Sequence, residues 1–321
     1  MPSNYLTKAE AQDFITNSLH VPLTDQELLG VDLSVSLLQK ICFAFTEHVP
    51  YSTMRYIPTP PEERELPTLE YVKHTGLNKL GGLCFETNVF LHWLLAGVGF
   101  DVDFLISKVF GSDFYNHALN VVRVCGKDYL ADGGITPLMT ENLICLDFDG
   151  DVSPISIQSI WEVRLKRHTS DDGQILFTGD FRWTENTAIP NWPVPIEDGW
   201  ACLYNEVPYK RLSLAKLSAL LRPAYMDPVI APVISRLFCL IFPRGRLVMI
   251  RGTVLYYEED GRQRTVVRTG SAEELVQLIL KHFGEFATEA VVRRAVKAHA
   301  ANGKVPDGWA NFPDVDRGIN G

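Results

Sequence analysis

One cysteine of this chain lies between a glycine pair and a helical pattern, in the stretch GGLCFETN at residues 81–88. Glycines let the backbone turn tightly before a helix begins. A helix N-terminus carries partial positive charge and free N–H groups, which stabilise a thiolate and can hold the oxyanion of a tetrahedral intermediate. The pattern therefore predicts Cys84 as a nucleophile, although a small buried side chain packing a helix start fits it too. We expect Glu86 and Asn88 to hold the N-terminus of this helix.

A cysteine nucleophile needs a base and a group that orients the base, and two adjacent predicted strands offer both. His117 opens the strand HALNVVRV, and Asp132 closes the next strand, KDYLAD. If residues 125–126 form the connecting loop, His117 and Asp132 are diagonal neighbours on one face, roughly 7–8 Å apart. If residues 126–127 form it, the two side chains are too far apart without a bulge. The spacing permits a triad with Cys84, but it equally permits a histidine bonded to backbone and an aspartate that forms a turn.

The elements that must position these residues change character along the chain. Helical patterns dominate up to residue 98, and a period of two, typical of strands, dominates after residue 100. Capping-box signatures at Thr7 and Thr24 predict two helix starts. Further helices are predicted over residues 34–47, 85–98, 271–282 and 286–300. Strands are predicted over residues 102–110, 117–124, 127–132, 153–158, 160–168 and 173–183, with a strand pair around Asp260 and Gly261.

The composition narrows the class of protein. The chain has 321 residues, 46% of them hydrophobic, and a net charge of −9, so it can bury a large core and lacks the basic footprint of a nucleic-acid-binding protein. Its N-terminus has no apolar signal core, and its longest apolar run, residues 229–242, is too short to span a bilayer. Six scattered cysteines without a C-x-x-C pair indicate free thiols rather than disulfides or zinc. We expect a cytoplasmic protein without membrane, nucleic-acid or metal partners.

Several motifs, in order along the chain, resemble those of the arylamine N-acetyltransferase family. The stretch GGLCFETN, followed by a helix and GFDV, resembles the nucleophile motif R-G-G-x-C-x-E-x-N. HALNVVRVCGKDYLADGG is similar to the segment that carries the family's histidine and aspartate. HVPY at residues 48–51 resembles H-I-P-F, and SAEELVQLILKHFG resembles a late helix that ends in F-G. The resemblance spans residues 35–140, with a weaker part at 240–285.

The resemblance implies an α+β fold of the arylamine N-acetyltransferase type, with a papain-like cysteine triad. A helical domain at residues 1–98 would carry the nucleophile, and a central antiparallel β-barrel at residues 99–200 would carry the histidine and the aspartate. An α/β lid with a C-terminal tail would follow at residues 201–321.

The resemblance also implies a reaction. Cys84 would be the nucleophile, His117 the base and Asp132 the orienting acid. An acetyl or similar acyl group would pass from acyl-coenzyme A through an acyl-cysteine to an amine in a ping-pong scheme. Acyl-coenzyme A would be a co-substrate, with no bound cofactor and no metal, and the partners would be a small-molecule acyl donor and an amine acceptor.

The chain departs from the family pattern on the acceptor side. Leu80 stands where the pattern has arginine, and Tyr51 is followed by Ser-Thr-Met where the pattern has an acidic residue. Losing both charges together is expected if they were partners. Ile135 replaces an aromatic residue that lines the acceptor pocket in the family. The resemblance therefore implies acyl transfer more firmly than an arylamine acceptor.

Two kinds of question stay open at this stage. The residues expected to contact substrate are Tyr51, Phe110, Phe114, Tyr115 and Ile135, although aromatic residues beside a strand also serve as core. The alternative functions are amide synthesis from a carrier-bound or polyketide acyl donor, hydrolysis by the same triad, and binding without catalysis.

Overall fold

The computed structural model describes residues 5–109, 111–134, 142–184, 199–260 and 264–302. Its α-helices, in chain order, are α1 (Lys8–Asp13), α2 (Asp25–Leu29), α3 (Val35–His48), α4 (Leu69–Leu77), α5 (Cys84–Val98), α6 (Leu214–Met226), α7 (Ala272–Phe283) and α8 (Glu289–Ala301). Both capping boxes are present: Thr7 and Thr24 each accept from the backbone N–H three residues later, and a glutamate side chain there accepts from the threonine N–H.

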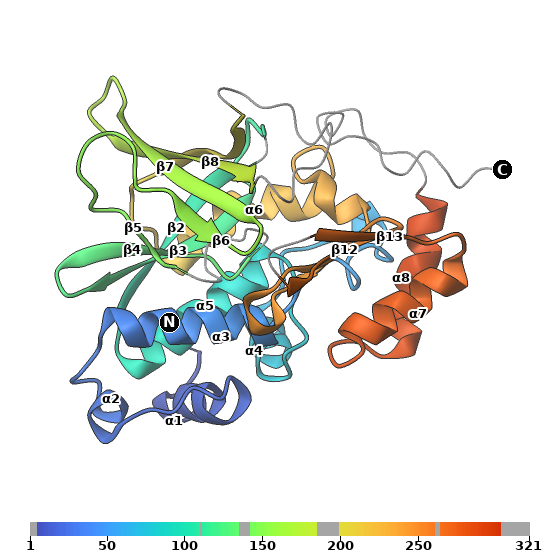
Figure 1. The fold of residues 1–321 in the computed structure, drawn as a ribbon, viewed down its shortest axis with the longest axis horizontal. Coiled ribbons are helices and arrows are strands. Elements are labelled where there is room, and N and C mark those ends of the chain that lie inside the picture. The colour runs from blue at the N-terminus through green and yellow to red at the C-terminus, as the bar shows by residue number, and fades with distance from the viewer. Residues whose placement is uncertain (1–4, 110, 135–141, 185–198, 261–263, 303–321) are drawn as a thin grey trace.

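The strands form two antiparallel sheets. One sheet has the order β1-β10-β11-β12-β13, and the other has the order β5-β4-β3-β2-β9-β8-β7-β6 and curls into a nearly closed barrel (Figure 1). The strands are β1 (Tyr51–Ser52), β2 (Asp101–Val109), β3 (His117–Val124), β4 (Lys127–Ala131), β5 (Ile144–Cys145), β6 (Ser156–Gln158), β7 (Trp161–Thr169), β8 (Ile175–Trp183), β9 (Ala201–Pro208), β10 (Phe238–Ile241), β11 (Val248–Arg251), β12 (Val254–Glu258) and β13 (Arg264–Arg268). The predicted α+β fold, with helices first and then an antiparallel barrel, is confirmed.

The connection between β3 and β4 settles the register that the sequence left open. Val124 pairs with Lys127 and Asn120 pairs with Ala131, so the loop is the two-residue pair Cys125 and Gly126. Both loop residues have positive φ, 53° and 75°. A two-residue hairpin turn needs these values, because its twist then matches the twist of the flanking strands. This is the register that allows His117 and Asp132 to meet.

Helix α5 lies between the N-terminal helices and the barrel. It packs against α1 and α4 on one side and against β2 and β3 on the other, and every residue except Ala96 is buried. Gly99 ends the helix with a φ of 119°, a conformation that favours glycine. The helix is therefore held from all sides, and its first residue, Cys84, has a fixed position beneath the barrel.

Several elements were not predicted. The strands β9 and β10 and the helix α6 occupy a region that the sequence patterns left mixed, and β11 adds a strand beside the predicted pair β12 and β13. Of the two residues expected at that hairpin's turn, Gly261 lies outside the described residues. Burial explains why β10 was missed, because it is buried along its whole length and carries no alternating pattern.

Candidate active site

Cys84 is the first residue of α5, and a strained turn leads into it. Gly81 has a φ of 65°, and a Cβ built there would lie 1.8 Å from the carbonyl oxygen of Pro50, so only glycine fits. The N-cap residue, Leu83, has no side chain that can accept a hydrogen bond. The Cys84 side chain is 4% exposed, and its Sγ lies 3.7 Å from the carbonyl oxygen of Asn116.

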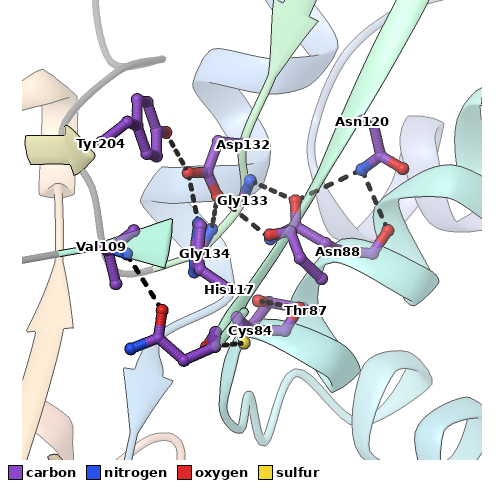
Figure 2. A network of polar contacts seen from close by, with 12 residues as sticks. Cys84, Thr87, Asn88, Val109, His117, Asn120, Asp132, Gly133, Gly134 and Tyr204 are labelled. Carbon is purple, nitrogen blue, oxygen red and sulfur yellow. Dashed lines mark hydrogen bonds and ion pairs between the residues drawn. The ribbon is translucent and has the colours of Figure 1, made fainter. Parts of the chain in front are cut away.

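The His117 and Asp132 side chains meet directly. His117 Nε2 lies 2.7 Å from Asp132 Oδ2, and both side chains are buried (Figure 2). Because Nε2 is bonded to Asp132, Nδ1 is the ring nitrogen left for the nearby Cys84 thiol. Burial alone would lower the pKa of His117, but the Asp132 carboxylate and the Cys84 thiol outweigh it and raise that pKa to about 10.

Donors from several elements surround the Asp132 carboxylate. Besides His117, the hydroxyl of Tyr204 donates to Oδ2 at 2.7 Å, and the Oδ1 atom accepts from Asn88 Nδ2 at 3.0 Å and from the Gly134 N–H at 2.8 Å. A carboxylate with this many donors is held as an anion and in one orientation. A Cβ at position 134 would lie 2.7 Å from His117 Cε1, so the absence of a side chain there lets the pair close up.

Asn88 does not hold the helix N-terminus, contrary to the expectation from sequence. Its Nδ2 also donates to the carbonyl oxygen of Ala118 at 2.8 Å, and its Oδ1 accepts from the Gly133 N–H at 2.9 Å. Asn120 Nδ2 donates to the Asn88 carbonyl and to Oδ1, at 3.1 and 3.2 Å. Asn88 therefore joins α5 to β3 and to the segment after β4, since one turn of helix separates it from the N-terminus and turns it toward the barrel.

Glu86 is a second buried carboxyl group at the start of α5. It is 2% exposed and accepts hydrogen bonds from the hydroxyls of Tyr56 and Tyr225, the latter at 2.8 Å. Among the described residues no basic side chain contacts it, and the position where the family pattern has arginine is Leu80. Burial raises the pKa of Glu86 to about 7, although its hydrogen bonds oppose the shift.

The residues expected to contact substrate are only partly brought to the site. Tyr51 is buried beside it, bridged to Gly82 and packed edge-to-face on Phe238 with ring centroids 5.8 Å apart. The Tyr115 hydroxyl donates a hydrogen bond to Glu206 at 2.7 Å. The Phe114 side chain is 54% exposed to solvent.

The two remaining candidates for substrate contact, Phe110 and Ile135, lie outside the described residues.

Three tyrosines that the sequence analysis did not select contact the carboxyl groups of the site. Tyr204 reaches Asp132 from β9, and Tyr56 and Tyr225 reach Glu86 from the loop after β1 and from α6. Tyr204 and Tyr225 lie 72 and 139 residues from the carboxylates they contact. No local pattern links residues at such separations, so one sequence alone carried no signal for them.

Two features of the described residues bear on possible metal and membrane partners. Within those ranges no three histidine, cysteine, aspartate or glutamate side chains gather as a metal site would require. None of the helices described here has the length and apolar character needed to cross a membrane.

The sequence matches a known family over most of its length. A family model described as N-acetyltransferase matches residues 34–285. The chain therefore belongs to the arylamine N-acetyltransferase family, as a divergent member, and is an N-acyltransferase. No curated protein matches the sequence.

Solved structures share the fold. The arylamine N-acetyltransferase from Salmonella typhimurium is 18% identical, with a TM-score of 0.69 over 91% of this chain and 100% of that one. The enzyme from Nocardia farcinica is 17% identical, with a TM-score of 0.68 over 92% of this chain and 97% of that one. The Mycobacterium marinum enzyme in complex with CoA is 14% identical, with a TM-score of 0.66 over 89% and 99% of the two chains. At these identities the likeness establishes the fold.

Proposed function

We propose that this enzyme transfers an acetyl or similar acyl group from acyl-coenzyme A to an amine through an acyl-Cys84 intermediate. The observation that carries the proposal is the buried His117–Asp132 pair, 2.7 Å apart, beside a cysteine at the first residue of a buried helix. Family membership supports the reaction class, and the CoA complex of the Mycobacterium marinum enzyme supports the donor.

In the first half-reaction, His117 Nδ1 takes the proton of the Cys84 thiol. The thiolate attacks the carbonyl carbon of the thioester, and the oxyanion that forms is stabilised by N–H groups at the start of α5. The bond between the carbonyl carbon and the sulfur of coenzyme A then breaks, and His117 returns the proton to the leaving thiolate. Asp132 keeps the imidazolium oriented and compensates its charge throughout.

In the second half-reaction, an amine attacks the carbonyl carbon of acyl-Cys84. His117 accepts the proton that the amine loses, the bond to Cys84 Sγ breaks, and an amide leaves. The sum converts an acyl-coenzyme A and an amine to an amide and free coenzyme A. We also propose that the enzyme works in the cytoplasm, where its six free cysteines stay reduced.

Mass spectrometry of the intact protein tests the proposal. Incubation with acetyl-coenzyme A should add one acetyl group, located on the peptide that contains Cys84, and Cys84→Ala should take none. Adding an arylamine or alkylamine should release the group as an amide.

Other outcomes would overturn parts of the proposal. Acylation only by a carrier-protein thioester would replace coenzyme A as the donor and favour amide synthesis from a carrier-bound chain. Release of free acid faster than amide would favour hydrolysis. An unmodified Cys84 with every thioester would overturn the nucleophile.

A further inference from the structure

The first turn of α5 has a cap that comes from a distant part of the chain. The usual cap is a side-chain oxygen at the N-cap residue, and Leu83 has none. Instead, the hydroxyl of Tyr225, in the last turn of α6, accepts from the Phe85 N–H at 3.0 Å and donates to Glu86 Oε2 at 2.8 Å. One hydroxyl thus forms two hydrogen bonds at the helix start, one with a backbone N–H group and one with a carboxyl group.

The Glu86 carboxyl completes this cap. Its Oε1 atom accepts from the Tyr56 hydroxyl and its Oε2 atom from the Tyr225 hydroxyl, so the carboxyl group anchors the hydroxyl that caps the Phe85 N–H. The Thr87 N–H is already bonded to the Leu83 carbonyl at 3.0 Å. In the part of the chain that the structure describes, the Cys84 N–H has no hydrogen-bond acceptor.

The Tyr225 ring is fixed independently of its hydroxyl. It is 2% exposed and packs edge-to-face on Tyr56, with centroids 5.6 Å apart, and on Phe85, with centroids 6.3 Å apart. Burial and the Glu86 carboxylate raise the pKa of Tyr225 well above its ordinary value, so the hydroxyl keeps its proton and can donate. Replacing tyrosine by phenylalanine removes the hydroxyl and leaves this packing in place.

From this geometry we propose that Tyr225 is a positioning residue for acyl transfer: its hydroxyl satisfies the Phe85 N–H and fixes the first turn of α5, so that the Cys84 N–H stays directed at the oxyanion. The inference rests on the proposed acyl-Cys84 chemistry. Without the hydroxyl, the buried Phe85 N–H has no partner, and the turn must rotate to find one. A rotation of this turn misplaces the donor that the tetrahedral intermediate needs, while the thiol and His117 stay in contact.

Two reactions of Cys84 separate this role from a merely structural one. Acylation by p-nitrophenyl acetate forms an oxyanion, whereas alkylation by iodoacetamide needs the thiolate but forms no oxyanion. Tyr225→Phe should slow acylation at least about tenfold and leave alkylation within about twofold of the wild-type rate. Tyr5→Phe is the matched control, because it removes a hydroxyl bonded to Glu70 at 3.0 Å, far from the site.

A second variant distinguishes the two hydrogen bonds of the Tyr225 hydroxyl, one with the Phe85 N–H and one with the Glu86 carboxyl group. Tyr56→Phe removes a donor to Glu86 but no partner of a backbone N–H. We expect it to slow acylation less than Tyr225→Phe does. Equal effects of the two variants on acylation, or equal losses of acylation and alkylation in Tyr225→Phe, would overturn the positioning role.

Amide hydrogen exchange in the wild-type protein gives a test that needs no variant. The Phe85 amide should be protected and the Cys84 amide should exchange faster, and the reverse order would overturn the inference. Because p-nitrophenyl acetate needs no coenzyme A site, a wild-type enzyme that accepts it but refuses acetyl-coenzyme A would contradict the proposed donor alone. If Cys84 reacts with neither donor, the proposed function fails, and the exchange experiment still decides the cap.

Discussion

Two buried carboxyl groups flank Cys84, and their surroundings differ in charge. Among the described residues, Asp132 accepts hydrogen bonds from the His117 imidazole and from uncharged donors, whereas Glu86 accepts them from two tyrosine hydroxyls. The two carboxyl groups therefore act on different pKa values. Asp132 contributes to raising the pKa of His117 to about 10, while burial raises the pKa of Glu86 itself to about 7.

The difference shows that the partner decides what a buried carboxyl group can do. A carboxylate beside an imidazolium stays charged and can stabilise a proton on the base. A carboxyl group without a cation takes up a proton near neutral pH and serves to hold the backbone. We expect the first group to matter chiefly for the rate and the second chiefly for the stability of the helix start.

Replacing the acid of the proposed triad should have the largest effect. Asp132→Asn leaves the shape of the side chain but removes the charge that holds the His117 imidazolium, and we expect acylation of Cys84 to slow by about 10³–10⁴-fold. Stopped-flow measurement with acetyl-coenzyme A gives the rate.

Asp128→Asn is the matched control for that variant. Asp128 is equally buried in β4 but pairs with Arg123 and Arg211. The Asp128→Asn substitution should lower the free energy of unfolding and leave the acylation rate of the folded enzyme unchanged. A similar loss of rate in both variants would contradict the proposed role of Asp132.

The second effect is the pH dependence of stability that His117 confers. Its folded-state pKa, about 10, lies above the ordinary value of 6.5, so its contribution is fully present below pH 6.5 and is lost as the pH rises through about 10. We expect the free energy of unfolding to fall by about 5 kcal/mol over this range relative to His117→Gln. Urea unfolding at a series of pH values measures it, and parallel curves for the two proteins would show that the pair is not charged.

The stability that Glu86 confers should also decrease with rising pH, but in a lower pH range. Its contribution is present below about pH 4.5 and is lost as the pH rises through about 7. The stability of the wild type relative to Glu86→Gln should therefore fall across this window, by at most about 3 kcal/mol.

Glu10→Gln serves as control for Glu86→Gln, because a hydrogen bond from Lys73 lowers the pKa of Glu10 to about 2. Its stability difference from the wild type should stay level above pH 4.5. A level curve for Glu86→Gln as well would indicate a carboxylate that stays charged throughout.

The smallest expected effect comes from the close approach at Gly134. An added Cβ would lie 2.7 Å from His117 Cε1 and 2.9 Å from Asp132 Oδ1, so the pair must separate. Gly134→Ala should slow acylation by about 10²-fold. Gly270→Ala, where the nearest atom is 3.5 Å away, should leave the rate unchanged. A normal rate in Gly134→Ala would show that the pair tolerates the displacement.

Local patterns predicted much of the fold because the relevant interactions span few residues. The capping boxes at Thr7 and Thr24, the helix that follows Cys84, and most barrel strands are present within a few residues of the predicted bounds. Patterns failed for β10, which is buried along its whole length and shows no alternation. The division into three domains and the role of each triad residue stay predictions.

The sequence by itself determined the chemical groups of this protein: a thiol behind two glycines, a histidine and an aspartate on adjacent strands, and a family to which the motifs pointed. It did not determine the register of β3 and β4, the dual bonding of Asn88, or the tyrosines that hold Asp132 and Glu86. The physical reason is that hydrogen bonds within a helix or a turn follow from neighbouring residues. Bonds between residues 72 or 139 positions apart exist only once packing has closed the chain around them.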